Sequence, residues 1–265
     1  MQAPIAVFFA LEAESGCFED RLKRAEHQHA AAFRTVSGTL HGVDFLVVQT
    51  GAGQKTARDV AQTVCRAHSP RMVISAGFAG ALTKGLKKED LLFPSEFLCK
   101  DQPILTLRSK LKPEFLPEEC QIGGRLLTVD QVAADPQTKR DLGVKFQAQA
   151  VEMESYAVAQ TAREMDLPFL SVRVISDTVD ETLPRDVQKL AEQKTTASRV
   201  GAALGMILGR PSSVKELWAL YQTSVSASAR LADALEALAK ADLFRFCSEN
   251  FAVPQEEQRL ISSGD

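Results

Sequence analysis

The chain alternates short apolar runs with apolar positions at helical spacing. The uninterrupted apolar run at residues 5–11 and the mainly apolar runs at residues 71–82 and 168–176 are typical of strands that are covered on both faces. Residues 54–68 have a helical period instead. Their apolar positions are Ala57, Val60, Ala61 and Val64.

The remaining pattern predicts further strands and helices. Residues 32–40 and 43–51 are two β-like segments separated by His41 and Gly42, a spacing that suits a tight hairpin. Pro136 favours a helix start near that position. Other strands are predicted over residues 90–99, 125–132 and 149–154, and other helices over residues 135–143, 155–165, 186–209 and 214–240.

This alternation predicts an α/β fold with helices on both faces of a sheet, where ligands bind at the carboxyl ends of strands. The sequence "GRPSS" after Gly209 breaks the helical pattern. We therefore expect one large domain over residues 1–209 and a C-terminal helical extension over residues 210–265.

Composition excludes several classes of protein. The chain has 265 residues, 45% of them hydrophobic, and a formal net charge of -3, which gives no general attraction to nucleic acid or anionic lipid. No segment approaches the roughly 20 apolar residues that span a bilayer. The five cysteines lack metal-binding or disulfide spacing and favour a reducing compartment. We expect a cytoplasmic protein.

Two motifs are poor matches to known ligand sites. "TGAGQKTARD" follows a strand and opens a helix, but Thr56 and Val48 stand where the dinucleotide fingerprint and the P-loop need glycine. A tight turn beside a ligand remains the interpretation of this segment. His27 and His29 lie two apart in a helix-like, charged stretch, so they are expected to point in different directions and to hold no metal.

Acidic residues follow several predicted strands. Glu152 and Glu154 in "VEMESYAVAQ" should share a face if the strand persists that far, which suits a solvated surface or a site that uses the charge. Asp177, at the end of "VRVISD", either caps the next helix or handles protons. Glu12 and Glu14 are favourable charges at a helix start. From spacing alone, these alternatives stay open.

Taken in order along the chain, Glu14, the Glu152–Glu154 pair, Arg173 and Asp177 resemble the purine nucleoside and uridine phosphorylase superfamily. Within it, the likeness is to 5'-methylthioadenosine/S-adenosylhomocysteine nucleosidases. The resemblance covers about residues 4–209 and is strongest in "VEMESYAVAQ" and "PFLSVRVISDTVDE". It implies a three-layer α/β/α fold with a central mixed, twisted β-sheet.

The resemblance also implies roles in cleaving the bond between a purine and its ribose. Asp177 would be the general acid toward purine N7, and Ser176 would help to orient it. Glu14 would position and deprotonate the attacking water, with Arg173 nearby.

Other residues would bind the sugar. Glu154 matches the ligand of the ribose hydroxyls, and Met153 would pack under the sugar. Glu152 would orient the strand end or act on the ribose indirectly.

The chain departs from the nucleosidase pattern at two positions. Phe78 stands where that pattern has serine, beside Gly77, and Val132 stands where it has a phenylalanine that stacks on adenine. The turns at Gly77 and Ala52 are nevertheless expected beside the ligand. These departures concern the specificity for methylthioadenosine more than the bond that is cleaved.

The resemblance leaves water and phosphate as possible nucleophiles. Phosphate generally needs arginines, and Arg71, Arg21 and Arg24 form no convincing pair for it, so hydrolysis is the first hypothesis and phosphorolysis the alternative. A third possibility is a nucleoside-binding protein without turnover. No cofactor or metal is expected.

The predicted partners are a small nucleoside and other copies of the chain, as a dimer, a trimer or a hexamer. The amphipathic C-terminal segment either packs on the core or a homodimer interface, or docks a partner. Its apolar positions include Leu217, Trp218, Tyr221, Leu231, Leu235 and Leu238.

Overall fold

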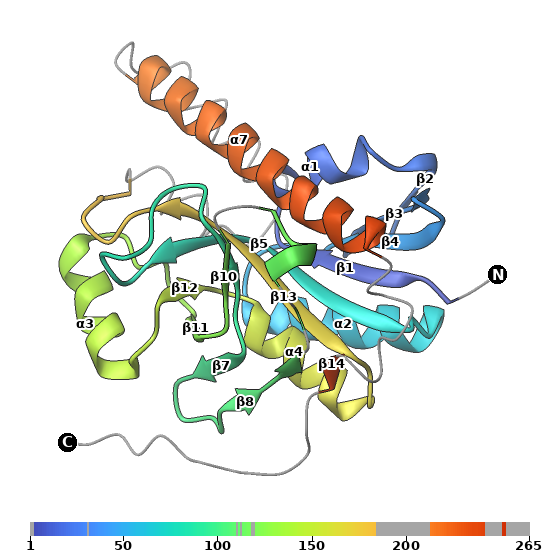
Figure 1. Cartoon of the computed structure of the whole chain (residues 1–265), viewed down its shortest axis with the longest axis horizontal. Coiled ribbons are helices and arrows are strands. Elements are labelled where there is room, and N and C mark those ends of the chain that lie inside the picture. Colours follow the sequence, from blue (N-terminus) through green and yellow to red (C-terminus); the bar gives the residue numbers. More distant parts are fainter. Residues whose placement is uncertain are drawn as a thin grey trace.

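The computed structural model of the chain describes residues 3–183, except 31, 110, 112, 118 and 119, together with residues 213–241 and 251–252 (Figure 1). The helix expected over residues 186–209 lies outside these residues. None of the described helices combines the length and apolarity that a membrane span requires.

Twelve strands of the described chain form one sheet that mixes parallel and antiparallel pairs. They are β1 (Ile5–Phe9), β2 (Lys23–His29), β3 (Arg34–Leu40), β4 (Val43–Gln49), β5 (Met72–Ala81), β6 (Leu91–Phe93), β7 (Glu96–Cys99), β8 (Leu105–Thr106), β10 (Cys120–Ile122), β11 (Arg125–Thr128), β12 (Ala150–Glu152) and β13 (Phe169–Asp177). The path runs β2-β3-β4-β1-β5-β12-β11-β7-β8, and β13 joins β5 to β6, which also pairs with β10. Two short strands, β9 (Arg108–Ser109) and β14 (Phe251–Ala252), pair separately.

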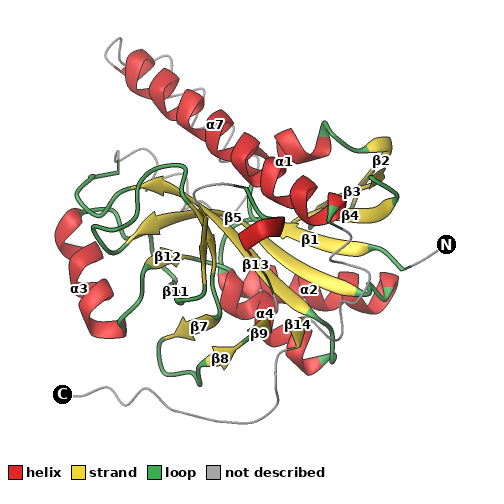
Figure 2. Ribbon diagram, viewed as in Figure 1, coloured by secondary structure: helices red, strands yellow, loops and turns green. Residues whose placement is uncertain are grey.

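Helices cover both faces of this sheet (Figure 2). One face carries α1 and α7, and the opposite face carries α2 and α4. The bounds are α1 (Glu12–Glu19), α2 (Gln54–His68), α3 (Pro136–Phe146), α4 (Ser155–Glu164) and α7 (Ser213–Lys240), and the described residues also include a 3-10 turn at Pro113–Phe115. The predicted three-layer α/β/α fold with a mixed sheet is confirmed.

Strand β5 changes its neighbour along its length. Its first residues, Met72–Ser75, pair in parallel with β1, whereas Gly80 and Ala81 pair in antiparallel fashion with β12 on the same side. Strand β13 runs along the other side, from Val73 to Gly80. Residues 76–79 therefore have a strand on one side only, and ligands in open α/β sheets bind where neighbouring strands diverge in this way.

Local sequence chemistry explains several element boundaries. His41 and Gly42 have φ of 50° and 80°, the left-handed values of a two-residue hairpin turn, and they join β3 to β4 as predicted. Asp135 caps α3 by accepting hydrogen bonds from the N–H groups of Gln137 and Thr138, and Pro136 occupies the first turn.

The helix-like interpretation of the segment around His27 and His29 is wrong. Both residues belong to β2, an exposed edge strand that pairs antiparallel with β3. Residues two apart in a strand share a face, so the two imidazoles do not diverge as a helix would require. Pairing with the β3–β4 hairpin decides the conformation, and the many charges of β2 suit an edge that must resist further pairing.

The second half of α7 packs on the core. Ala227, Leu231, Leu235 and Leu238 are buried in the same hydrophobic cluster as β1 and β5. At the rim, Arg21 of the α1 segment forms ion pairs with Asp233 and Glu236. Of the alternatives for this segment, packing on the core is therefore the one that applies to the second half of α7. The side chains of Leu217, Trp218 and Tyr221 are not among those that the structure describes. The domain boundary at Gly209 stays a prediction.

Truncating a buried side chain of α7 should destabilise the whole domain. Leu235→Ala leaves a cavity in the shared core, so we expect unfolding in urea to need about 3 kcal/mol less free energy. Val225→Ala on the same helix, where the side chain is 43% exposed, should cost under about 0.5 kcal/mol. Equal losses for both variants would contradict the packing of α7 on the core.

Candidate active site

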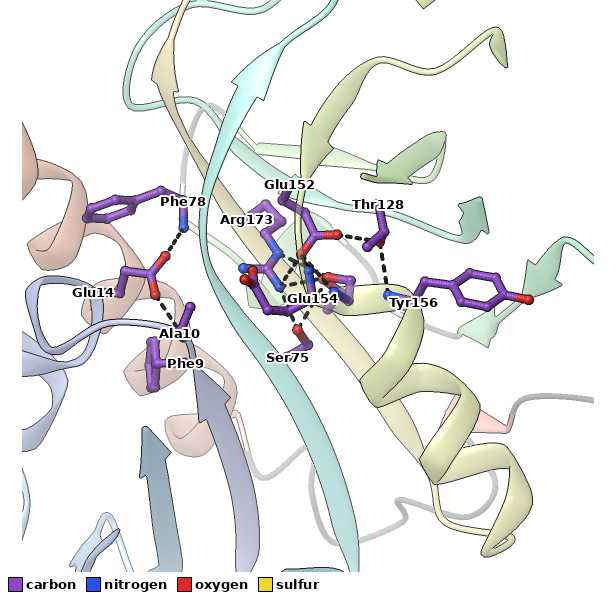
Figure 3. Close-up of polar contacts among 12 residues, drawn as sticks. Phe9, Ala10, Glu14, Ser75, Phe78, Thr128, Glu152, Glu154, Tyr156 and Arg173 are labelled. Carbon is purple, nitrogen blue, oxygen red and sulfur yellow. Dashed lines mark hydrogen bonds and ion pairs between the residues drawn. The ribbon is translucent and has the colours of Figure 1, made fainter. Parts of the chain in front are cut away.

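Glu14 lies beside residues 76–79 of β5, the stretch between the end of its pairing with β1 and the start of its pairing with β12. It is the third residue of α1, and its carboxylate turns back over the helix start (Figure 3). Its Oε2 accepts hydrogen bonds from the N–H groups of Ala10 and Leu11, both at 2.9 Å, and its Oε1 accepts one from Phe78 at 2.8 Å. The side chain is 5% exposed. Three backbone donors thus fix one buried carboxylate at the open side of β5.

The environment of Glu14 acts on its pKa in two directions. Burial raises the pKa of this carboxyl above its ordinary value, while the Phe78 N–H, the charge of Arg173 and the Leu11 and Ala10 N–H groups lower it. The net direction is upward. A carboxylate with a raised pKa is a stronger base toward a bound water than an ordinary surface glutamate.

Gly77 is required by close approach. A Cβ at this position would lie 2.6 Å from Glu14 Oε1 and would also collide with the Arg173 guanidinium. Only glycine lets β5 pass between these two charged groups. Gly77 therefore shapes the site by having no side chain.

Glu152 and Glu154 do not share a strand face, contrary to the alternation argument. Strand β12 ends at Glu152, and Glu154 is already the N-cap residue of α4. Glu152 turns inward: its Oε2 accepts hydrogen bonds from the N–H groups of Glu154 and Ser155, at 2.9 and 2.7 Å, and its Oε1 accepts one from Thr128 Oγ1. Glu152 therefore connects the start of α4 to Thr128, at the end of β11, and to Arg173 on β13.

Arg173 is the cation at the centre of this cluster. It lies on β13, is 2% exposed, and its guanidinium is 3.1 Å from Glu152 Oε2. The same group donates to the hydroxyls of Ser75 and Ser155, at 2.5 and 2.7 Å (Figure 3). A buried charge is tolerated when it is paired and hydrogen-bonded, and Arg173 meets both conditions.

Glu154 carries the costliest charge at the site. Its Oε1 accepts a hydrogen bond from the N–H of Gly53 at 2.6 Å, in the turn that follows Ala52. Burial, and then the neighbouring charge of Glu152, raise the pKa of Glu154 to about 8, against the lowering effects of the Gly53 N–H and Arg173. The charge of Glu14 raises it further, which places the three carboxylates in one electrostatic neighbourhood.

A narrow crevice, too tight to hold a water molecule, lies among these groups. Its lining includes two of the predicted site residues, Glu154 and Arg173. The remaining lining residues are Phe8, Phe9, Ala10, Thr50, Ser75, Ala76 and Val158. Glu14 and Asp177 are not among the residues that line it, although both are buried against β5, Glu14 from α1 and Asp177 from β13.

Asp177 is the last residue of β13 and lies opposite Gly80 of β5. Its Oδ1 is 2.6 Å from the hydroxyl of Ser176, and its Oδ2 is 2.5 Å from Lys139 Nζ. Gly77, beside Glu14, and Gly80, beside Asp177, are three residues apart on one strand, which corresponds to roughly 10 Å.

The other predicted site residues border the same region. Phe78 gives its N–H to Glu14, while its ring points away from the Glu152–Arg173 cluster (Figure 3). Met153 is half-buried between Glu152 and Glu154, and Val132 is half-buried in the loop after β11.

The sequence analysis did not identify several residues that contact Arg173 or Asp177. Ser75 and Ser155 give no local signal, because they meet Arg173 only after distant strands come together. The sequence does carry a signal for Lys139. It precedes Leu142, Gly143 and Phe146 by three, four and seven residues, so helical periodicity places it on the same, inner face of α3. A lysine on the inner face of a helix indicates a buried partner.

Within the described residues, no three histidine, cysteine, aspartate or glutamate side chains gather in a way that could hold a metal ion.

Residues 4–210 match the family model of the Phosphorylase superfamily, and the chain belongs to this family. The family prediction is confirmed.

The chain is similar to particular nucleosidases and hydrolases. The 5'-methylthioadenosine/S-adenosylhomocysteine nucleosidase of Bacillus cereus (strain B4264) is 27% identical over 196 residues, which are 65% of this chain and 85% of that protein. The structure of the corresponding nucleosidase from S. pneumoniae, solved with a transition-state inhibitor, superposes with a TM-score of 0.68 at 19% identity and covers 90% of this chain and 99% of that chain. The futalosine hydrolase of Helicobacter pylori superposes with a TM-score of 0.66 at 18% identity, over 91% and 100% of the two chains.

The raised pKa of Glu154 makes a prediction about stability and pH. Because the folded pKa, about 8, exceeds the ordinary 4.5, the contribution of this group to stability is full below about pH 4.5 and is lost as pH rises through about 8. Glu154→Gln has no such loss. We expect the Tm of the variant to gain roughly 5 °C on that of the wild type between pH 5 and pH 9, measured by circular dichroism.

The matched control is Glu26→Gln, which neutralises an exposed carboxylate on β2. Its Tm relative to the wild type should stay nearly constant over the same pH range. If the two variants followed the same curve, Glu154 would not be the buried charge that the structure indicates.

Proposed function

We propose that the protein is a purine nucleosidase that hydrolyses the bond between the base and the ribose of a 5'-methylthioadenosine-like nucleoside. The observation that carries the proposal is Glu14, a buried carboxylate held by three backbone N–H groups at the point where β5 changes neighbours. Its raised pKa suits a general base that binds the attacking water.

The leaving group needs an acid at a distance from that base. Gly77, which lies against Glu14, and Gly80, which lies against Asp177, are roughly 10 Å apart along β5, and this spacing can accommodate a sugar and the near edge of its base. In the proposed reaction Asp177 protonates purine N7 as the bond to the ribose breaks, and Ser176 orients its carboxyl through Oδ1. Two carboxyl groups with opposite roles require different surroundings, and these two have different partners.

Glu154 is the proposed ligand of the ribose hydroxyls. It lines the narrow crevice beside Arg173, and its Oε1 accepts a hydrogen bond from the Gly53 N–H, which leaves Oε2 for the substrate. Glu152 is better explained as a positioning residue, because it ties together the start of α4 and the Arg173 guanidinium. Met153 would pack against the sugar, and Gly77 and Ala52 would let the backbone approach it.

Water is the proposed nucleophile because the nearby cations already have protein partners. Arg173 is paired with Glu152 and two serines, and Arg21 is paired with Asp233 and Glu236 on α7. A phosphate dianion would need such groups free to bind it. Phe78 beside the ribose and Val132 beside the base would set the preference among purine nucleosides. Assembly into a homo-oligomer remains part of the proposal.

The test is release of free base. Purified protein is incubated with adenosine, inosine and 5'-methylthioadenosine, with and without phosphate, and the products are separated by chromatography. We expect free base and a free ribose derivative at equal rates in both conditions. Strict dependence on phosphate would make the enzyme a phosphorylase, and no release from any nucleoside would favour a binding protein.

Replacing the proposed acid should separate catalysis from binding. Asp177→Asn removes the proton donor, so we expect release to fall by about 10²–10⁴-fold while the Kd for the nucleoside changes by less than about fivefold. Asp180→Asn is the control. Asp180 lies three residues after Asp177 in the sequence, is exposed, and pairs with Arg140. Unchanged release by Asp177→Asn would contradict the assigned role.

A further inference from the structure

Lys139 is a fully buried lysine that contacts the proposed acid. It lies on α3, its side chain is 0% exposed, and its Nζ is 2.5 Å from Asp177 Oδ2. The same nitrogen donates to the carbonyl oxygens of Thr178 and Glu181, at 2.9 and 2.8 Å. An ammonium group has three donors, and all three are used: one on the carboxylate and two on the loop that follows β13.

This arrangement has a physical cost. Taking an ammonium group out of water is unfavourable unless its partners compensate for the lost hydration. A charge buried against a catalytic carboxylate is therefore unlike the rim pairs of the molecule, such as the exposed Arg140–Asp180 pair on the next residue. The position of Lys139 directs its charge at one oxygen of Asp177.

The partners of Asp177 leave it no other cation. Oδ1 faces the hydroxyl of Ser176, and Oδ2 faces Lys139 and is otherwise without a hydrogen-bond partner among the described residues. Gly80 lies against the same carboxylate, where a Cβ would be 3.0 Å from Oδ2. The Asp177 carboxylate is thus held between the Ser176 hydroxyl, the Lys139 ammonium group and the backbone of β5 at Gly80.

Resting on the proposed function, we propose that Lys139 is a positioning residue for the reaction: the acid toward purine N7 is the Lys139–Asp177 pair, in which Asp177 touches the base and Lys139 holds the proton. In the resting pair the ammonium faces the carboxylate. As the glycosidic bond breaks, its electron pair goes to the purine. A proton passes from Lys139 Nζ to Asp177 Oδ2, and Asp177 delivers that proton to N7.

The step balances in charge and protons. Lys139 ends as a neutral amine, Asp177 ends as a carboxylate, and the purine leaves neutral. The attacking water gives its oxygen to the sugar and one proton to Glu14. Solvent then carries that proton from Glu14 back to Lys139, which restores the resting state without any further reactant.

A purely structural role is the rival explanation. Lys139 also ties down the loop at Thr178 and Glu181, so its loss could disturb the site without any part in proton transfer. The two explanations differ for a substrate that needs no proton. A 7-methylpurine nucleoside already carries the positive charge on its base, so its cleavage does not depend on an acid at N7.

The experiment compares Lys139→Met on the best purine nucleoside and on its 7-methyl derivative. We expect kcat to fall by at least about 10-fold for the unmethylated substrate and by less than about threefold for the methylated one. Arg140→Met is the matched control. It removes the positive charge of the next residue, which is exposed, and it should change neither rate. Circular dichroism checks that each variant is folded.

A double-mutant cycle covers the case in which Lys139→Met alone does not fold. The variant that combines Lys139→Met with Asp177→Asn leaves no unpaired buried charge. If Lys139 acts through Asp177, this double variant should release base as slowly as Asp177→Asn alone, within about twofold. A further loss in the double variant would show that Lys139 acts independently of Asp177 and would overturn the proposal.

The remaining outcomes are also decisive. Equal losses on both substrates for a folded Lys139→Met would assign the lysine a structural role only, and a wild-type rate on the unmethylated substrate would remove it from the reaction. If the wild-type protein released no base from either substrate, the proposed function itself would be wrong, and this would be seen before any variant is made.

Discussion

The site depends on one constraint, the change of neighbours along β5. A strand that is flanked on both sides offers no backbone group to anything else, but residues 76–79 have β13 on one side and no strand on the other. The free N–H of Phe78 there is taken by Glu14, and glycine at position 77 lets Glu14 and Arg173 approach the strand. The divergence of β1 and β12 thus creates both the opening and the first polar contact within it.

The buried charges of this region are arranged at the expense of stability. Three carboxylates and one guanidinium lie within the same electrostatic neighbourhood, and the raised pKa of Glu154 shows that one of them is poorly compensated. Glu152, by contrast, has an arginine, a hydroxyl and two N–H groups. A fold selected for stability alone would not keep Glu154 at this position, because a neutral side chain would accept the Gly53 N–H equally well. Uneven compensation is a mark of groups that serve a ligand.

The sequence predicted what depends on local periodicity. The apolar runs that became β1, β5 and β13, the helix α2 and the His41–Gly42 hairpin were all readable, because burial on two faces and left-handed turns leave local patterns. The edge strand β2 was not, since its conformation comes from pairing with β3 and its charged composition resembles a solvated helix.

The site was predictable in its acids but not in their partners. Family likeness pointed to Glu14, Glu154 and Asp177, yet the strand argument for the glutamate pair failed because the chain turns into α4 after Glu152. Lys139 and the serines around Arg173 are 18 to 98 residues from their partners and become neighbours only in the folded chain.

The seam between α1 and α7 has a consequence for shortened forms of the chain. Ser228 Oγ donates to the carbonyl oxygen of Glu14 and accepts from the N–H of Cys17, so α7 braces the very turn of α1 that carries the proposed base. A truncated chain that stopped at the family boundary near residue 210 would bare the apolar back of α1 and leave that turn unsupported. We therefore expect the smallest stably folded form of this protein to extend beyond the residues that match the family model.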